Sequence, residues 1–244
     1  MRRSRTLAKL LRAVAQHEEA LPAKEAVHRM RVTTRRLRAA LRLLRLRDLD
    51  PDVKRLQDAL GDVRDLQLQV AWLRDRDAAL HRARQQALER AEAALQRELR
   101  RWHSRTLPAL LQAAADEADP SRRKTRKLVR KRLGRLDERL ERARAHLTPK
   151  ALHRARISVK QVRYTIEVAK ASLPKKGVRL DSFKALQASL GELHDVDVRI
   201  GLVKHHKTLQ REQREARERL AKIVAAQLER WRSEKVVAHI RKRL

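Results

Sequence analysis

Histidine and basic side chains recur at helical spacing near residue 30. The series is His28, Arg31, Arg35, Arg38 and Arg42. On an α-helix with about 100° per residue, these side chains fall within an arc of about 80°, and the first four span about 15 Å. Arginine donates two parallel hydrogen bonds to phosphate, and histidine donates one and gains charge beside an anion. The spacing therefore predicts a basic strip that contacts a linear, phosphate-rich anion.

The same spacing of histidine and basic residues returns 125 positions later. The second series is His153, Arg156, Lys160 and Arg163. Another block repeats as well, because Gln57–Asp65 resembles Gln187–Asp195 at a separation of 130 positions. Two blocks in the same order indicate a duplicated helical unit, with halves at 1–118 and 119–244. The recurrence favours a binding strip over the alternative, a helix face that is merely solvated.

Two lysines and two departures from the repeat complete the set of candidate site residues. Lys54 and Lys184 match across the repeat, and we expect them to be additional phosphate contacts, with plain surface lysines as the alternative. Gln161 replaces a basic residue of the first half, and Glu167 stands where the first half has Arg42. We therefore expect the second half to bind the anion more weakly.

The composition predicts an all-α protein. Leu, Ala, Arg, Glu and Gln dominate, and the chain has only five glycines and six prolines, as is typical of long helices. Asp50, Asp119 and Thr148 each precede a proline, a pattern that indicates a helix start. We expect turns at Leu60–Asp65 and Leu190–Asp195, whose aspartates cap a helix or pair with a basic one. The expected helices lie near 4–20, 23–47, 51–60, 63–76, 78–117, 120–146, 149–172, 180–190 and 194–242.

An apolar stripe accompanies each basic strip. In the first half this stripe is Met30, Thr34, Leu37, Leu41 and Leu44, centred roughly 120° from the basic strip on an ideal helix. In the second half it is Ala155, Val159, Val162, Ile166 and Ala169. Each of the two helices is therefore predicted to have a core face and an adjacent cationic edge.

The charge balance points to an anionic partner. The 244 residues include 62 Lys and Arg against 30 Asp and Glu, a formal net charge of +32. Such an excess destabilises a compact state by self-repulsion unless an anion is near. Cysteine is absent, which excludes a disulfide framework, thiol catalysis and Cys-ligated zinc. We see neither a signal peptide nor an apolar run that could span a membrane, so we expect a cytoplasmic protein without a membrane partner.

The sequence resembles the conserved-histidine α-helical domain family, abbreviated CHAD. The resemblance rests on His28–Arg38, His153–Arg163 and the Leu-Gly-x-x-x-Asp blocks at 60–65 and 190–195. It covers the chain as a single domain from about residue 5 to the C-terminus. Family resemblance implies two four-helix bundles related by a pseudo-twofold axis. It also implies a basic surface or channel that binds inorganic polyphosphate, and location at polyphosphate granules.

We therefore expect a non-enzymatic protein that binds polyphosphate, or a similar phosphate-rich polyanion, in one basic groove lined by both strips. A nucleic-acid binder is the first alternative, although aromatic residues make up only 2% of the chain and are scattered, whereas single-strand binders need stacking platforms. A metal-assisted phosphohydrolase is the second alternative, although the strips lack the carboxylates that hold metals. No cofactor is expected. The long C-terminal helix can pack within the chain or pair with another copy, so a homodimer stays open.

Overall fold

Helices account for all the regular structure in the part of the chain that the computed structural model describes, residues 4–173 and 180–244. The predicted all-α class is confirmed. The chain divides into two compact units, Met1–Pro120 and Ser121–Leu244. None of the described helices is long and apolar enough to cross a membrane.

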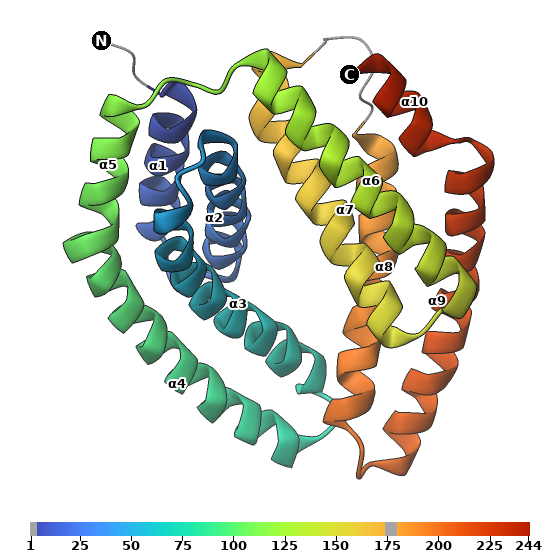
Figure 1. Cartoon of the computed structure of the whole chain (residues 1–244). Helices are drawn as coiled ribbons and strands as arrows, with labels where there is room; N and C mark the ends of the chain where they lie inside the picture. The colour runs from blue at the N-terminus through green and yellow to red at the C-terminus, as the bar shows by residue number, and fades with distance from the viewer. Residues whose placement is uncertain (1–3, 174–179) are drawn as a thin grey trace. The chain divides into compact units, whose positions relative to one another are not determined.

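The first unit is a run of antiparallel neighbours that pack in chain order. Its elements are α1 (Arg5–Glu18), α2 (Lys24–Leu44), a 3-10 turn (Arg47–Leu49), α3 (Asp50–Leu73), α4 (Ala78–Arg101), a π turn (Trp102–Thr106) and α5 (Leu107–Asp116). Helix α2 packs between α1 and α3, α4 packs on α3, and α5 returns to α1. Figure 1 shows α4 and α5 as one curved rod, which the π turn joins.

The second unit repeats this order of helices. Its elements are α6 (Arg122–His146), α7 (Pro149–Ala169), a 3-10 turn (Lys170–Ser172), α8 (Asp181–Leu202), α9 (Lys207–Ser233) and α10 (Val236–Arg243). Helix α7 packs between α6 and α8, α9 packs on α8, and α10 returns to α6. Phe183 on α8 meets Trp231 on α9 edge to face, with ring centroids 5.1 Å apart, and both rings are buried in the core of this unit.

The predicted core stripes of α2 and α7 are buried, except that Leu44 at the end of α2 is partly exposed. Met30, Leu37 and Leu41 are fully buried on α2. On α7, Ala155 and Val159 are fully buried and Ile166 is 3% exposed. This burial holds α2 and α7 in one rotation about their axes, so the adjacent basic strips must lie at the edge of each helix.

Two of the expected turns are wrong, because α3 and α8 continue through their glycines. Gly61 is buried in the middle of α3, where an added Cβ would lie 3.2 Å from Nη2 of Arg31. This glycine therefore serves the close approach of an arginine from α2 and does not end the helix. Gly191 has open space around it, and the flanking Leu190 and Leu193 are buried in one continuous helix. A single glycine costs a helix only about 1 kcal/mol, which tertiary packing offsets.

Several helix ends also differ from the expectation. The predicted helix 194–242 breaks before α9, where the His206 ring accepts a hydrogen bond of 3.3 Å from the backbone N–H of Leu209. It breaks again at Lys235, whose φ is 48°. Asp119 does not start α6; it accepts a 2.7 Å hydrogen bond from the hydroxyl of Ser4 and so fixes the start of α1. Thr148 does cap α7, as predicted, by accepting from the N–H of Ala151.

Candidate functional site

The basic strip of α2 divides into two parts with different surroundings. His28 is exposed, and the arginines that follow it on the strip are partly exposed. Near the start of α2 the strip faces further positive charge from α3, whereas near the end of α2 it faces a carboxylate.

The first part forms a cationic cluster with α3. We call His28, Arg31, Arg35 and Arg64 the α2–α3 cluster. Partial burial lowers the pKa of His28, and the positive charges of Arg64, Arg35 and Arg31 lower it further, against the opposing effect of Glu25. Arg64 comes from α3 and donates a 3.4 Å hydrogen bond to the carbonyl of Lys24 at the start of α2. Burial is the largest cause of the lowered pKa of His28, and the three arginines add to it.

Three carboxylates lie near this cluster: Glu25 interacts with His28 and Arg64, Asp62 interacts with Arg31, and Asp65 also reaches Arg31. Asp65 on α3 is 3.6 Å from Nη1 of Arg31. The predicted pairing of this aspartate with a basic helix is confirmed. The aspartate side chain remains 59% exposed, whereas that of Arg31 is 21% exposed. Solvent therefore weakens this pair, so Arg31 can exchange Asp65 for another anion at little cost.

A matching cluster lies between α7 and α8 in the second unit. We call His153, Arg156, Lys160 and His194 the α7–α8 cluster. The rings of His153 and His194 have centroids 5.2 Å apart. Burial, Arg156 and Lys160 lower the pKa of His153. Burial lowers the pKa of His194 to about 4, together with Arg156, His153 and Lys160, while Asp197 opposes the shift.

Arg64 and His194 are candidate site residues that the analysis of the sequence did not single out. They lie on α3 and α8, whereas the predicted strips follow α2 and α7. The signal was present in the repeat, because the two residues are 130 positions apart and each directly precedes a matched aspartate. A search restricted to the spacing along one helix cannot find a residue that the neighbouring helix contributes.

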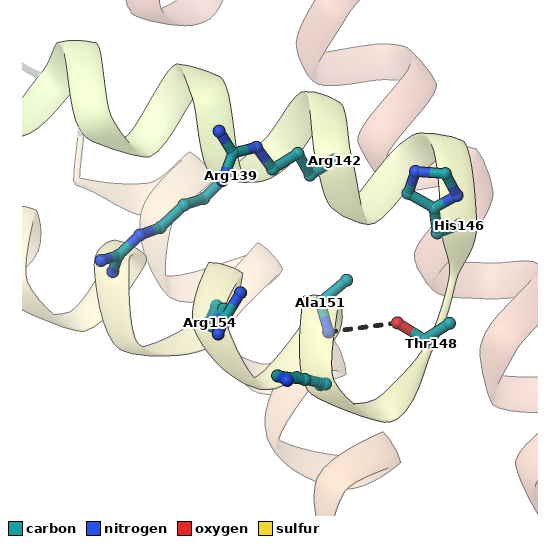
Figure 2. Close-up of a pocket in the computed structure, with 7 residues that line it drawn as sticks. Arg139, Arg142, His146, Thr148, Ala151 and Arg154 are labelled. Atoms are coloured by element: carbon teal, nitrogen blue, oxygen red, sulfur yellow. Dashed lines mark hydrogen bonds between the residues drawn. The ribbon is translucent and has the colours of Figure 1, made fainter.

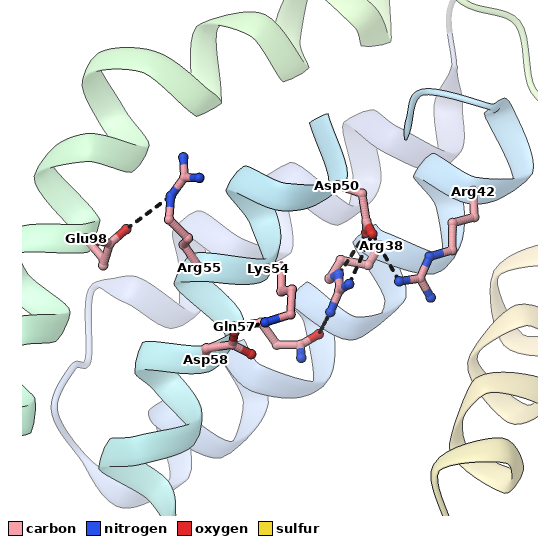
Figure 3. A network of polar contacts seen from close by, with 8 residues as sticks. All are labelled: Arg38, Arg42, Asp50, Lys54, Arg55, Gln57, Asp58 and Glu98. Carbon is pink, nitrogen blue, oxygen red and sulfur yellow. Dashed lines mark hydrogen bonds and ion pairs between the residues drawn. The ribbon is translucent and has the colours of Figure 1, made fainter. Parts of the chain in front are cut away.

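The end of the first strip is bound to a carboxylate. Arg38 donates to both oxygens of Asp50, at 2.8 and 3.1 Å, and also to Gln57 at 3.3 Å. Arg42 donates to the same carboxylate at 3.0 Å. Figure 3 shows both guanidinium groups converging on Asp50. Burial raises the pKa of this carboxyl group, but hydrogen bonds and charges from the two arginines outweigh it and hold the pKa below its ordinary value.

The end of the second strip is also paired, but within its own helix. Arg163 donates to Glu167 at 2.9 Å, and the two side chains are only 13% and 14% exposed. The guanidinium of Arg163 also stacks over the ring of Tyr164, 4.6 Å from its centroid. These contacts give Arg163 a role in holding α7 together, beside any contact with an anion.

The two predicted lysine contacts lie in solvent beside carboxylates. Lys54 pairs with Asp58 one turn along α3 (Figure 3). Lys184 is 3.3 Å from Asp181 at the start of α8. All four side chains are about half exposed or more, so both pairs are weak and either lysine can turn to another anion.

The chemistry available at the two clusters is the binding of anions. Guanidinium and ammonium groups donate charge-assisted hydrogen bonds to phosphate oxygens, and the depressed histidines can take up protons when an anion arrives. Among the described residues, no three histidine or carboxylate side chains gather as they would around a metal ion.

Comparison with known proteins identifies the class. The sequence matches the CHAD domain family over residues 5–204, and the chain therefore belongs to this family. A crystal structure of the CHAD domain from the plant Ricinus communis has a similar fold, with a TM-score of 0.65 and 23% sequence identity. That match covers 97% of this chain and 88% of that chain. No curated protein matches the sequence.

Proposed function

We propose that this protein binds inorganic polyphosphate through the α2–α3 and α7–α8 clusters, does no chemistry on it, and is located at polyphosphate granules. The observation that carries the proposal is the matched pair of clusters. Each has a histidine followed by two basic residues on one helix, and a further basic or histidine side chain from the next helix. Membership of the CHAD family supports the same ligand.

The electrostatics of the clusters favour a polymer of phosphates over a single anion. Each cluster holds permanent positive charges close enough to depress a histidine pKa, so a phosphate that enters neutralises repulsion already present in the folded protein. A long flexible chain can bring phosphates to both clusters, and its second contact is then intramolecular. Two modest contacts thereby give a tight complex.

The strip residues beyond the clusters contribute differently in this proposal. Arg38, Arg42 and Arg163 already have carboxylate partners, so a phosphate must compete with a carboxylate for them. We therefore assign the larger share of the binding energy to the clusters, and a smaller share to these three arginines, Lys54 and Lys184.

Charge reversal within the clusters tests the proposal. The double variant Arg35→Glu, Lys160→Glu changes one residue in each cluster and leaves the Arg31–Asp65 pair in place. We expect its affinity for long-chain polyphosphate at about 0.15 M salt to fall at least about 100-fold, because two attractions become repulsions. Isothermal titration calorimetry measures the affinity, and circular dichroism checks that the helices survive.

A matched control separates the clusters from the general field of a basic protein. Arg90 on α4 and Arg214 on α9 are exposed and lie one in each unit. The variant Arg90→Glu, Arg214→Glu therefore makes the same change in net charge away from the clusters. Equal losses of affinity in the two variants would mean that the protein attracts polyanions without a defined site, and the nucleic-acid alternative would then regain its standing.

A further inference from the structure

A basic pocket lies in the second unit, where the end of α6 turns into the start of α7. It is open to solvent on one side and has a volume of about 410 Å³, a size typical of small-ligand sites. The residues that line it are Arg139, Arg142, His146, Thr148, Lys150, Ala151 and Arg154. Figure 2 shows Arg139 and Arg142 on α6 and Arg154 on α7, with His146 and Thr148 close to the loop that joins the two helices.

The lining of this pocket is positively charged and therefore favours an anionic ligand. Four of the seven described residues that line it carry a permanent positive charge, one is a histidine, and none is acidic. The positive dipole end of α7 and the negative dipole end of α6 both lie at this turn, so the four cationic side chains set the charge of the pocket. Arg139 is fixed by a 2.6 Å hydrogen bond to the hydroxyl of Ser158 on α7.

The pocket is separate from the α7–α8 cluster. Lys150 and Arg154 are one turn apart on α7, and on an ideal helix their face points roughly 120° away from the strip that begins at His153. That face looks toward α6, which supplies Arg139 and Arg142, whereas the strip looks toward α8. An anion in the pocket therefore does not occupy the cluster.

The first unit has different residues at the equivalent positions. At the repeat separation of 125 positions, Glu25 stands where Lys150 stands, and Ala23 stands where Thr148 stands. Glu25 pairs with Arg29 at 2.9 Å, and Ala23 gives α2 no side-chain cap. The pocket is thus a feature of the second unit and not a general consequence of the helix turn.

We propose that this pocket binds the terminal phosphate of a short linear phosphate, either free or as the end of a polymer. A terminal phosphate carries up to two negative charges near pH 7, since its second pKa is about 6, whereas a phosphate inside a chain carries one. A concave site with several cations favours the more highly charged group. Binding of the end of a polyphosphate chain rests on the proposed function. Binding of a free short phosphate does not depend on it.

Inorganic triphosphate is the probe that tests the pocket. The variant Arg142→Gln, Lys150→Glu removes one cation and installs at position 150 the residue type that the first unit has at Glu25. We expect the affinity of the full chain for triphosphate to fall at least about tenfold, because two charge-assisted contacts are lost. The variant Arg214→Gln, Arg219→Glu on the exposed side of α9 makes the same change in net charge and should alter the affinity less than about twofold.

Two further arms locate the ligand and guard against misfolding. The single variant Arg142→Gln changes an exposed side chain and must also weaken triphosphate binding if the pocket is the site. The pocket variant should bind long-chain polyphosphate with free ends more weakly than the parent does. It should bind the same polymer with amine-blocked ends as tightly as the parent does. If only free triphosphate responds, the pocket takes short phosphates alone. If the pocket variants and the α9 control bind triphosphate equally well, the proposal is wrong, whether or not long chains bind at the clusters.

Discussion

The lowered pKa of His194 allows the electrostatics of the α7–α8 cluster to be tested by measurement. His194 lies on α8 beside the ring of His153. Burial, the charges of Arg156 and Lys160, and His153 bring its pKa from 6.5 to about 4. In the free protein we therefore expect this ring to be neutral at pH 7 and to titrate far below the ordinary range of histidine.

The sign of the effect on stability follows from proton binding. The unfolded chain binds a proton at His194 near pH 6.5, whereas the folded chain resists it until about pH 4. The stability contribution is complete above pH 6.5 and is lost as the pH falls toward 4. A shift of this size corresponds to about 3 kcal/mol at roughly 1.4 kcal/mol per pH unit. Because the ring is only about half buried, solvent screening reduces the expected loss to roughly 1–2 kcal/mol.

Two measurements check this prediction. A histidine NMR titration gives the pKa of His194 directly, and chemical denaturation at pH 7 and pH 4.5 gives the loss of unfolding free energy. The variant His194→Gln should lose roughly 1–2 kcal/mol less than the parent over that interval, since the carboxylates titrate alike in both. The variant His205→Gln, at an exposed site, should behave like the parent. A resonance of His194 that titrates near pH 6.5, or equal losses in parent and His194→Gln, would refute the reasoning.

Three further predictions concern the ligand. Polyphosphate should bind more tightly as the pH falls from about 7.5 to 6 and below, because bound phosphate raises histidine pKa values that are depressed in the free protein; the variant His28→Gln, His153→Gln should show a flatter pH profile by calorimetry. Asp50→Asn should cost about 1–3 kcal/mol in denaturation, since it strips Arg38 and Arg42 of their carboxylate, while raising the affinity for polyphosphate. Polyphosphate should displace bound DNA at a lower phosphate concentration at about 0.15 M salt in an electrophoretic competition, and equal competition per phosphate would contradict the assignment.

The helices and their buried faces could be predicted from the sequence, because apolar residues at helical spacing lie on one face of a helix and that face is buried. The stripe from Met30 to Leu41 lies in the core as expected. The incorrect predictions concern residue types that can play two different structural roles. Gly61 was expected to break a helix but instead makes room for Arg31, and Asp119 was expected to cap α6 but instead fixes the start of α1. Only tertiary neighbours distinguish these uses.

The candidate site could be predicted in part, for a related reason. Spacing along α2 identifies the strip, but it gives no sign of which strip residues meet a carboxylate. Asp50 was interpreted as a helix cap, because it precedes a proline, whereas its side chain holds Arg38 and Arg42. Arg64 could not be assigned to the cluster from the sequence, because that assignment depends on α3 packing on α2. The repeated order of helices in the two units supports a duplication, and under that proposal the match of Arg64 with His194 is informative.

Comparison of the two units suggests how their binding differs. Asp50 pairs with two arginines at the end of the first strip, whereas Glu167 pairs with Arg163 alone in the second. The end of the first strip therefore keeps one more positive charge, in line with the expectation that the second half binds an anion more weakly. The clusters differ more. The α2–α3 cluster has three permanent positive charges, whereas the α7–α8 cluster has two together with a pair of histidines in contact. Under the proposed function, we expect the affinity of the second cluster for phosphate to depend more steeply on pH, because two histidines can take up protons there and one can in the first cluster.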